Sequence, residues 1–173
     1  YKGKGVFVLT HKEFLTMRHQ LTQFEMELIK PFFSANQINS YDVEMDNYQW
    51  LIYTDEKGKN LLETKRNLCP TLVNHLDKYK DVITSDNKPY GINRTKKESN
   101  FSDKNKLVFV RKTQYPKFAF IPFPFFSDES VYFILPQSGS YSQFYLLSVL
   151  NSTIAHFWFS RHKTQGRQLQ IDK

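Results

Sequence analysis

The stretch GVFVLTHKEFLTMRHQLTQFEMELIKP, residues 5–31, passes from a strand pattern directly into a helix pattern and so predicts a mixed fold. Its apolar run Val6–Leu9 favours a buried strand. Thr10 and Glu13 follow with the spacing of a capping box, in which each side chain accepts a hydrogen bond from a free backbone N–H at a helix start. Apolar residues then recur at steps of four, three and four from Met17 to Leu28, which predicts one amphipathic helix ended by the proline that follows.

The middle of the chain repeats this alternation of strand and helix patterns. Trp50–Tyr53 predicts a strand, and Asp55–Lys59, which contains a glycine, predicts a turn or loop. Pro70 suits the first turn of a helix, where its missing N–H costs nothing. One apolar face of that helix is expected at Leu72, Leu76, Tyr79 and Ile83.

The second half of the chain contains three further strand patterns and a long apolar segment. The strands are expected at Lys106–Arg111, Phe118–Ile121 and Val131–Leu135, the first with clear alternation. Tyr141–Ser160 predicts a single buried helix, in which Asn151 needs a hydrogen-bonding partner. We therefore expect an α+β fold, with a mixed short-stranded sheet and about three principal helices, in one domain over residues 1–173.

The bulk composition limits the class of protein. The 173 residues are 40% hydrophobic and 16% aromatic, which is too apolar for a disordered tail. The lone Cys69 rules out an internal disulfide and a cysteine-rich zinc site, and it fits a reducing, cytoplasmic setting. The chain starts without methionine, so we expect a fragment of a longer protein, and we expect no signal peptide because no long apolar run follows the start. The apolar run Phe144–Phe159 is too short to span a membrane, so no membrane partner is expected.

Positive charge is concentrated in Asp86–Lys117. This segment has nine basic and three acidic residues, a net charge of +6, while the whole chain carries +7. Aromatic residues are interleaved with the bases, as on surfaces that bind polyanions. The segment therefore favours a nucleic acid as partner, and the simpler alternative is a solvated charged loop.

No catalytic or metal-binding motif is apparent. The glycines near the N-terminus precede a strand, so they do not form a nucleotide-binding turn, and the five histidines lack the spacing of metal ligands. A nuclease site built from Asp55, Glu63 and Lys65 is not favoured, because such combinations of residues often arise by chance in charged loops. Pro122–Phe126 does not match the Pro-Pro-Tyr loop that an adenine-N6 methyltransferase needs. We expect no catalytic residue and no metal ligand in this chain.

Six phrases of the sequence, in this order, carry a family resemblance: GKGVFVLT (residues 3–10), LIKPFF (28–33), WLIYT (50–54), NHLDKYK (74–80), TSDNKPYGINRTKKE (84–98) and YLLSVLNSTIAHFWFSRHKTQGRQLQIDK (145–173). Together they resemble the C-terminal specificity domain of TaqI-like and Eco57I-like adenine-N6 DNA methyltransferases, with the closest likeness to fused type IIG restriction–modification enzymes. The likeness is weakest over Phe101–Phe126, where we expect the readout of bases.

The resemblance implies that this chain is a target-recognition domain that binds double-stranded DNA. It also implies an upstream methyltransferase domain in the same polypeptide, which would use S-adenosylmethionine, and a nuclease using Mg²⁺ in fused members. No cofactor is expected in this fragment. Such enzymes flip the target base out of the helix, which requires firm contacts to the DNA on both sides.

Three groups of residues are candidates for DNA contact. Each has a simpler alternative: a solvated loop for the first group, surface charge at a strand end for the second, and a frayed C-terminus for the third. The groups are Lys88, Arg94, Lys96 and Lys97; then Arg111 and Lys112; then Arg161, Lys163, Gln165, Arg167 and Gln168.

The aromatic residues are assigned to the core rather than to base stacking: Phe7, Trp50, Phe144, Phe157 and Trp158. Two other functions stay open at this point. One is a nucleic-acid-binding accessory module, for RNA or phage defence, without a link to methylation. The other is a free-standing enzyme with an unrecognised site.

Overall fold

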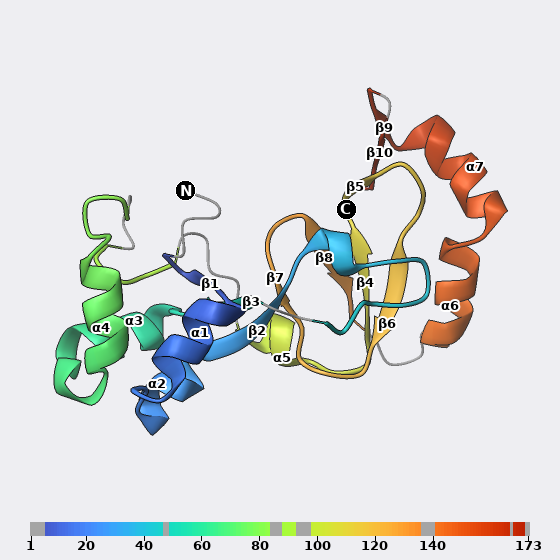
Figure 1. Ribbon diagram of the computed structural model, residues 1–173. Helices are drawn as coiled ribbons and strands as arrows, with labels where there is room; N and C mark the ends of the chain where they lie inside the picture. Colours follow the sequence, from blue (N-terminus) through green and yellow to red (C-terminus); the bar gives the residue numbers. More distant parts are fainter. Residues whose placement is uncertain are drawn as a thin grey trace. The chain divides into compact units, whose positions relative to one another are not determined.

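The chain divides into two units in the computed structural model, which describes residues 6–46, 49–83, 88–92, 98–135, 141–166 and 168–171 (Figure 1). Unit 1 comprises Tyr1–Phe32 and Tyr48–Glu98, and unit 2 comprises Phe33–Asn47 and Ser99–Lys173. Both units mix helices and strands, which confirms the α+β class. The elements are shorter and more numerous than the sequence patterns indicated, with seven α-helices and ten strands among the described residues.

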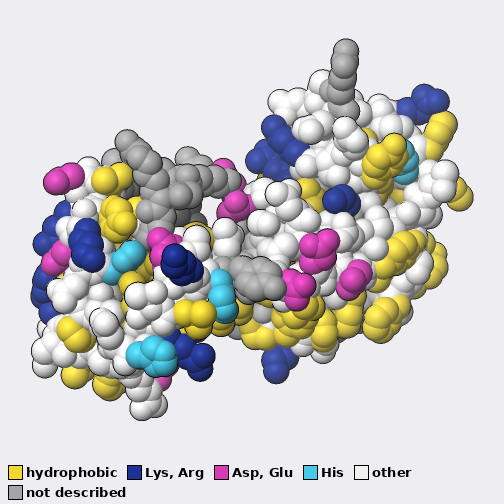
Figure 2. Space-filling view, in the orientation of Figure 1, with side chains coloured by type: hydrophobic (Ala, Val, Ile, Leu, Met, Phe, Trp, Pro, Cys, Tyr) yellow, Lys and Arg dark blue, Asp and Glu magenta, His cyan; other side chains and the backbone are white. Residues whose placement is uncertain are grey.

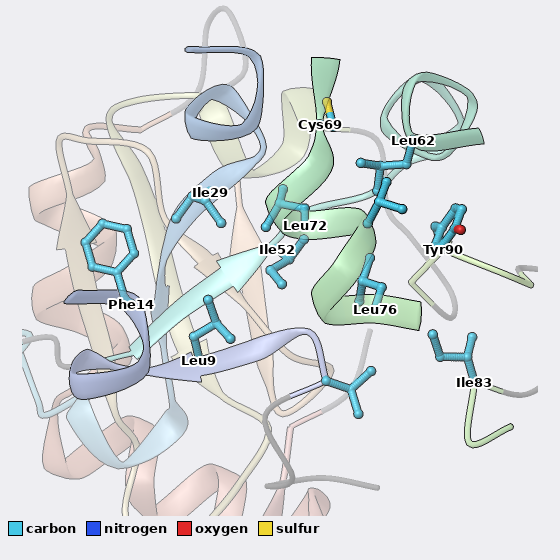
Figure 3. Packing of buried hydrophobic residues seen from close by; sticks show 12 residues of the cluster. Leu9, Phe14, Ile29, Ile52, Leu62, Cys69, Leu72, Leu76, Ile83 and Tyr90 are labelled. Carbon is cyan, nitrogen blue, oxygen red and sulfur yellow. The ribbon is translucent and has the colours of Figure 1, made fainter. Parts of the chain in front are cut away.

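Unit 1 is built on three antiparallel strands with helices around them. The strand β3 lies between β1 and β2, with Leu9 opposite Trp50 and Lys30 opposite Leu51. The elements are β1 (Val8–Thr10), α1 (His11–Arg18), α2 (Gln23–Glu27), β2 (Ile29–Phe33), β3 (Gln49–Ile52), α3 (Glu56–Thr64) and α4 (Pro70–Asp77). The core of this unit gathers side chains from all of its described helices except α2, and from all three strands (Figure 3).

The single helix expected from Met17 to Leu28 is wrong. The structure has α1 and α2 instead, because Thr22 starts a new helix with a second capping box: its hydroxyl accepts the Glu25 N–H, and the Glu25 carboxylate accepts the Thr22 N–H. Pro31 does not end a helix but lies in β2, opposite Trp50. The first capping box, at Thr10 and Glu13, is confirmed.

The turn or loop expected at Asp55–Lys59 is also wrong, because α3 begins at Glu56. The Asp55 carboxylate accepts the Gly58 N–H at 2.9 Å and so caps the helix. A Cβ atom on Gly58 would lie 3.1 Å from Leu28 Cδ2 and 3.3 Å from the Tyr53 carbonyl oxygen. A glycine is therefore tolerated inside this helix because the neighbouring segments approach it closely.

Glu25 is a fully buried carboxylate that caps two helices. One carboxylate oxygen accepts the Thr22 N–H of α2 at 2.8 Å, and the other accepts the Leu72 N–H in the first turn of α4, also at 2.8 Å. Both donors are N–H groups that a helix start leaves without a partner within the helix. Glu25 thereby ties α2 to α4, and Pro70 lies at the expected first position of α4.

Replacing Glu25 with glutamine is expected to lower the free energy of unfolding by about 2 kcal/mol, because the amide keeps one acceptor and turns an N–H donor toward a backbone N–H. The midpoint of urea unfolding, followed by circular dichroism, measures this loss. The matched control is Glu27→Gln, an exposed position on the same helix, which should leave the midpoint unchanged. Equal midpoints for the two variants would contradict the double-cap role.

Unit 2 has a three-stranded antiparallel sheet with an apolar cluster on each face. The central strand β4 pairs with β6 on one side and β8 on the other. Alternate residues of β4 join different clusters, with Val108 and Val110 in one and Leu107 and Phe109 in the other. The elements are α5 (Glu98–Ser102), β4 (Lys106–Val110), β5 (Lys112–Thr113), β6 (Phe118–Ile121), β7 (Phe126–Ser127), β8 (Val131–Ile134), α6 (Gln143–Leu150), α7 (Thr153–His162), β9 (Thr164–Gln165) and β10 (Gln168–Gln170).

The long buried helix expected over Tyr141–Ser160 is two helices. The break falls at Asn151 and Ser152, and the Ser152 hydroxyl accepts the Ala155 N–H at 3.1 Å to start α7. The inner sides of α6 and α7 cover one face of the sheet through Leu147 and Phe159. Their outer sides are exposed, because only one face of a surface helix can contact a sheet.

Lys106, at the start of β4, is a buried cation. Its Nζ atom donates to the carbonyl oxygens of Phe101 (2.5 Å), Asp103 (2.7 Å) and Asn100 (3.3 Å), and it lies 5.1 Å from the centre of the Phe133 ring. Burial lowers the pKa of Lys106 to about 8, against the opposing effect of the Asp103 charge. Lys106 thus fastens the end of α5 and the residues after it to the central strand.

Candidate nucleic-acid interface

A second three-stranded sheet in unit 2, the C-terminal sheet, consists of β5, β9 and β10 (Figure 1). The strand β10 is central and antiparallel to both neighbours, with Leu169 opposite Thr113 and Gln168 opposite Gln165. Two backbone bonds extend the pairing, from Ile171 N–H to the Arg111 oxygen at 2.9 Å and from Gln170 N–H to the Lys163 oxygen at 2.8 Å. The sheet therefore joins two groups of DNA-contact candidates that are far apart in the sequence.

The register of this sheet places four long polar side chains on one face. Residues directly opposite each other, and residues two apart on a strand, point to the same side of a sheet. The face defined in this way, called the glutamine face below, consists of Lys112, Gln165, Gln168 and Gln170. The first three are exposed and Gln170 is half-buried.

The opposite face of the C-terminal sheet anchors it to unit 2. Leu169 is 4% exposed and belongs to the apolar cluster formed by α6, α7 and the larger sheet, and Thr113 is 8% exposed. Gly166 has a φ of +63° between β9 and β10. This left-handed conformation suits glycine, and no atom lies near enough to restrict a side chain there, so the backbone angle alone explains the residue.

The last turn of α7 adds polar groups beside the glutamine face. The His162 ring donates from Nδ1 to the Trp158 carbonyl oxygen at 2.8 Å, since a carbonyl can only accept, and it stacks on the Trp158 ring. An open, shallow depression is lined by His162, Lys163, Thr164, Gln165 and Gln170. His162, Thr164 and Gln170 were not candidates from the sequence, and only the pairing register could have indicated Gln170.

Two predicted arginines rest on aromatic rings. The Arg111 guanidinium lies 5.8 Å from the centre of the Tyr132 ring, and that of Arg161 lies 4.2 Å from the centre of the Phe157 ring. Arg161 is exposed, and Arg111 is half-buried. Both arginines therefore keep their charge close to the C-terminal sheet, at its β5 end and its α7 end.

The basic-loop candidates are only partly described. Lys88 is exposed and belongs to unit 1, whereas Arg94, Lys96, Lys97 and, in the third group, Arg167 lie outside the described residues.

Two residues after Lys88, the buried Tyr90 fastens this segment to α4. Its hydroxyl donates to Asp77 at 2.7 Å and accepts from Arg66 at 2.5 Å. Burial and the neighbouring Asp77 carboxylate raise the pKa of Tyr90.

The assignment of five aromatic residues to the core is wrong for three of them. Phe144 is 62% exposed, Phe157 59% and Trp158 48%, whereas Phe7 and Trp50 are half-buried and pack against the core of unit 1. Figure 2 accordingly shows hydrophobic side chains on the surface in the region where Figure 1 draws α6.

Other kinds of site find no support in the described part of the chain. None of its helices is long and apolar enough to cross a membrane. Among the same residues, no three histidine, cysteine or acidic side chains gather where they could hold a metal ion. What the described residues do offer is a polar sheet face, flanked by cations and held on an α+β scaffold.

The chain belongs to the family of TaqI-like C-terminal specificity domains, whose model matches residues 30–171. This match confirms the resemblance found in the sequence phrases. The fold is similar to part of the type IIL restriction–modification enzyme MmeI, whose structure was solved in complex with DNA, with a TM-score of 0.67 and 13% sequence identity. The alignment covers 97% of this chain and 22% of that chain. No curated protein sequence matches the chain.

Proposed function

We propose that this chain is the target-recognition domain of a restriction–modification protein and binds double-stranded DNA. The observation that carries the proposal is the C-terminal sheet, which gathers Lys112, Gln165 and Gln168 on one exposed face in a member of a specificity-domain family. Lysine displaces counterions from phosphates, and a glutamine amide can pair with an adenine edge through two hydrogen bonds. The face thus combines anchoring and readout chemistry.

The wider proposal concerns the protein that carries this domain. It is an adenine-N6 methyltransferase of the type IIG kind, acting in the cytoplasm, with its methyltransferase domain elsewhere in the same polypeptide. S-adenosylmethionine would bind to that domain, and Mg²⁺ to a fused endonuclease. The role of this domain is to set which adenine is presented for methylation, and the fused endonuclease would cleave the DNA.

The binding proposal is tested by fluorescence anisotropy with a labelled DNA duplex, a double-stranded RNA and a single-stranded RNA of matching sequence. Preferential binding to duplex DNA, with an affinity that falls linearly as salt rises on logarithmic axes, is the expected result. Preference for either RNA would favour an RNA-binding accessory module instead. Absence of binding to all three would refute both readings.

Replacing Gln165 and Gln168 together with alanine is expected to relax sequence preference while leaving general DNA affinity nearly unchanged. Each lost bidentate base contact should reduce discrimination by about tenfold, near the lower end of its usual range. Sequencing of methylated adenines in DNA modified by the full-length protein measures the change. Gln23→Ala, an exposed glutamine on α2, is the control. An unaltered set of methylated sites in the double variant would count against the readout role.

A further inference from the structure

The side chain of Asn151 pairs with the backbone of Phe118 as a neighbouring strand would. Its Oδ1 atom accepts the Phe118 N–H at 3.1 Å, and its Nδ2 atom donates to the Phe118 carbonyl oxygen at 2.8 Å and to the Leu147 oxygen at 3.2 Å. The orientation of the amide follows from chemistry, because a backbone N–H can only donate and a carbonyl can only accept. The corner between α6 and α7 is thereby fixed to β6.

Phe118 is also the point where β6, β4 and α7 meet. It lies opposite Phe109 in the pairing of β6 with β4, and their rings stack with centres 5.0 Å apart. On α7, the ring of Phe159 stacks on that of Phe118 with centres 6.1 Å apart. One residue therefore contacts both the strand that leads to β5 and the helix that leads to β9.

Two segments of the chain connect Phe118 and its contacts to the C-terminal sheet. The first contains β5, which is joined to β4 through Arg111 and to Phe118 through residues 114–117. The second starts at Asn151, runs through the ten residues of α7 and Lys163, and enters β9. The glutamine face forms only when β10 pairs in register with both β5 and β9. The start of α7 must therefore hold a set position relative to β4.

We propose that Asn151 is a positioning residue for the glutamine face, acting through α7 rather than by touching DNA. This inference rests on the proposed function for its consequence on DNA, while its structural part stands on the contacts of Phe118. Asn151 fixes the first turn of α7, and the helix carries that position to Lys163 and the β9–β10 hairpin. Gln165 and Gln168 depend on it for their distance from Lys112.

Asparagine suits this position because it offers a donor and an acceptor on one short side chain. Aspartate has nearly the same shape but can only accept when ionised. It would keep the bond from the Phe118 N–H and bring a carboxylate oxygen against the Phe118 and Leu147 carbonyl oxygens, which now receive a donor. N151D therefore tests the pairing chemistry with little change in volume.

The N151D variant is expected to lose about tenfold in affinity for duplex DNA, which is within the range that substitutions away from a ligand produce. Hydrogen exchange should show faster exchange of the hairpin amides, Gln170 above all, with unchanged exchange in β4. The matched control is Ile121→Val, which loosens the opposite end of β6 and should leave both the DNA affinity and the hairpin exchange as they are. Wild-type affinity and wild-type hairpin exchange in folded N151D would overturn the proposal.

Hydrogen exchange on the unchanged chain decides the matter if N151D does not fold. The amides of Phe118, Lys163 and Gln170 are expected to open together, because release of Asn151 frees α7 and the hairpin as one unit. If the Phe118 amide opens while Gln170 stays protected, the hairpin keeps its place without Asn151 and the proposal is wrong. If the unchanged chain does not bind DNA, the proposed function is refuted but the positioning role of Asn151 is not, since this exchange pattern does not depend on DNA.

Discussion

Reversing the charges of Lys112 and Lys163 together, to glutamate, is expected to weaken duplex binding by about 100-fold at roughly 0.1 M salt. Lys112 lies on the glutamine face, and Lys163 borders it at the start of β9. Each lost phosphate contact removes the counterion release that accompanied it. The slope of log affinity against log salt should therefore become shallower by about two, in addition to the loss of affinity itself.

The control for this double variant carries the same change of charge elsewhere. Lys57 on α3 and Lys78 just after α4 are exposed, so Lys57→Glu with Lys78→Glu lowers the net charge equally in unit 1. If both double variants lose affinity equally, binding responds to net charge and not to the C-terminal sheet. Far-UV circular dichroism on each variant checks that the folds are intact.

Replacing Lys106 with methionine is expected to destabilise the fold by about 2 kcal/mol at pH 7. Two effects oppose each other. Methionine fills the volume of the lysine stem and removes the cost of a buried charge, but it leaves the carbonyl oxygens of Phe101, Asp103 and Asn100 without that donor. The second effect is larger because three acceptors are lost at once. Lys104→Met, at an exposed neighbour, is the control and should be neutral.

The loss caused by Lys106→Met should grow with pH. The pKa of Lys106 is lowered to about 8 from its ordinary 10.5, so between these values the unfolded chain binds more protons than the folded one. The contribution of Lys106 to the free energy of unfolding therefore rises with pH through that window, by about 1–2 kcal/mol between pH 8 and pH 9.5. The Lys106→Met variant should show no such rise. Tyr53, whose pKa burial raises to about 12 from 10.0, works in the opposite direction at higher pH. Urea unfolding below pH 10 isolates Lys106, and parallel pH profiles for the two proteins would contradict the buried-cation account.

Strand positions were the most predictable part of the fold. Trp50–Tyr53, Lys106–Arg111 and Phe118–Ile121 lie within one residue of β3, β4 and β6, because short apolar or alternating runs are local signals. Helix ends were less predictable. The second capping box, at Thr22 and Glu25, was present in the sequence but stood inside an apolar period that also suits one continuous helix.

Burial of the late helices could not be inferred from composition. Between Gln143 and His162 the apolar residues are not confined to one helical face, so no sequence pattern indicates that only the side carrying Leu147 and Phe159 contacts the sheet. The sequence indicated separate residues of the candidate interface but not how they come together. The interface depends on pairing between β5 and β10, two segments far apart in the sequence, and neither segment alone indicates that they pair.

The pairing of Lys112 with Gln170 and of Thr113 with Leu169 has a consequence for changing specificity. A hairpin grafted from a relative would replace three positions of the glutamine face but would leave Lys112 in place, since that residue arrives on a separate segment. New preferences would then require matched exchanges in residues 112–113 and 164–170. In a family under pressure to recognise new sequences, these two segments should be inherited as a pair.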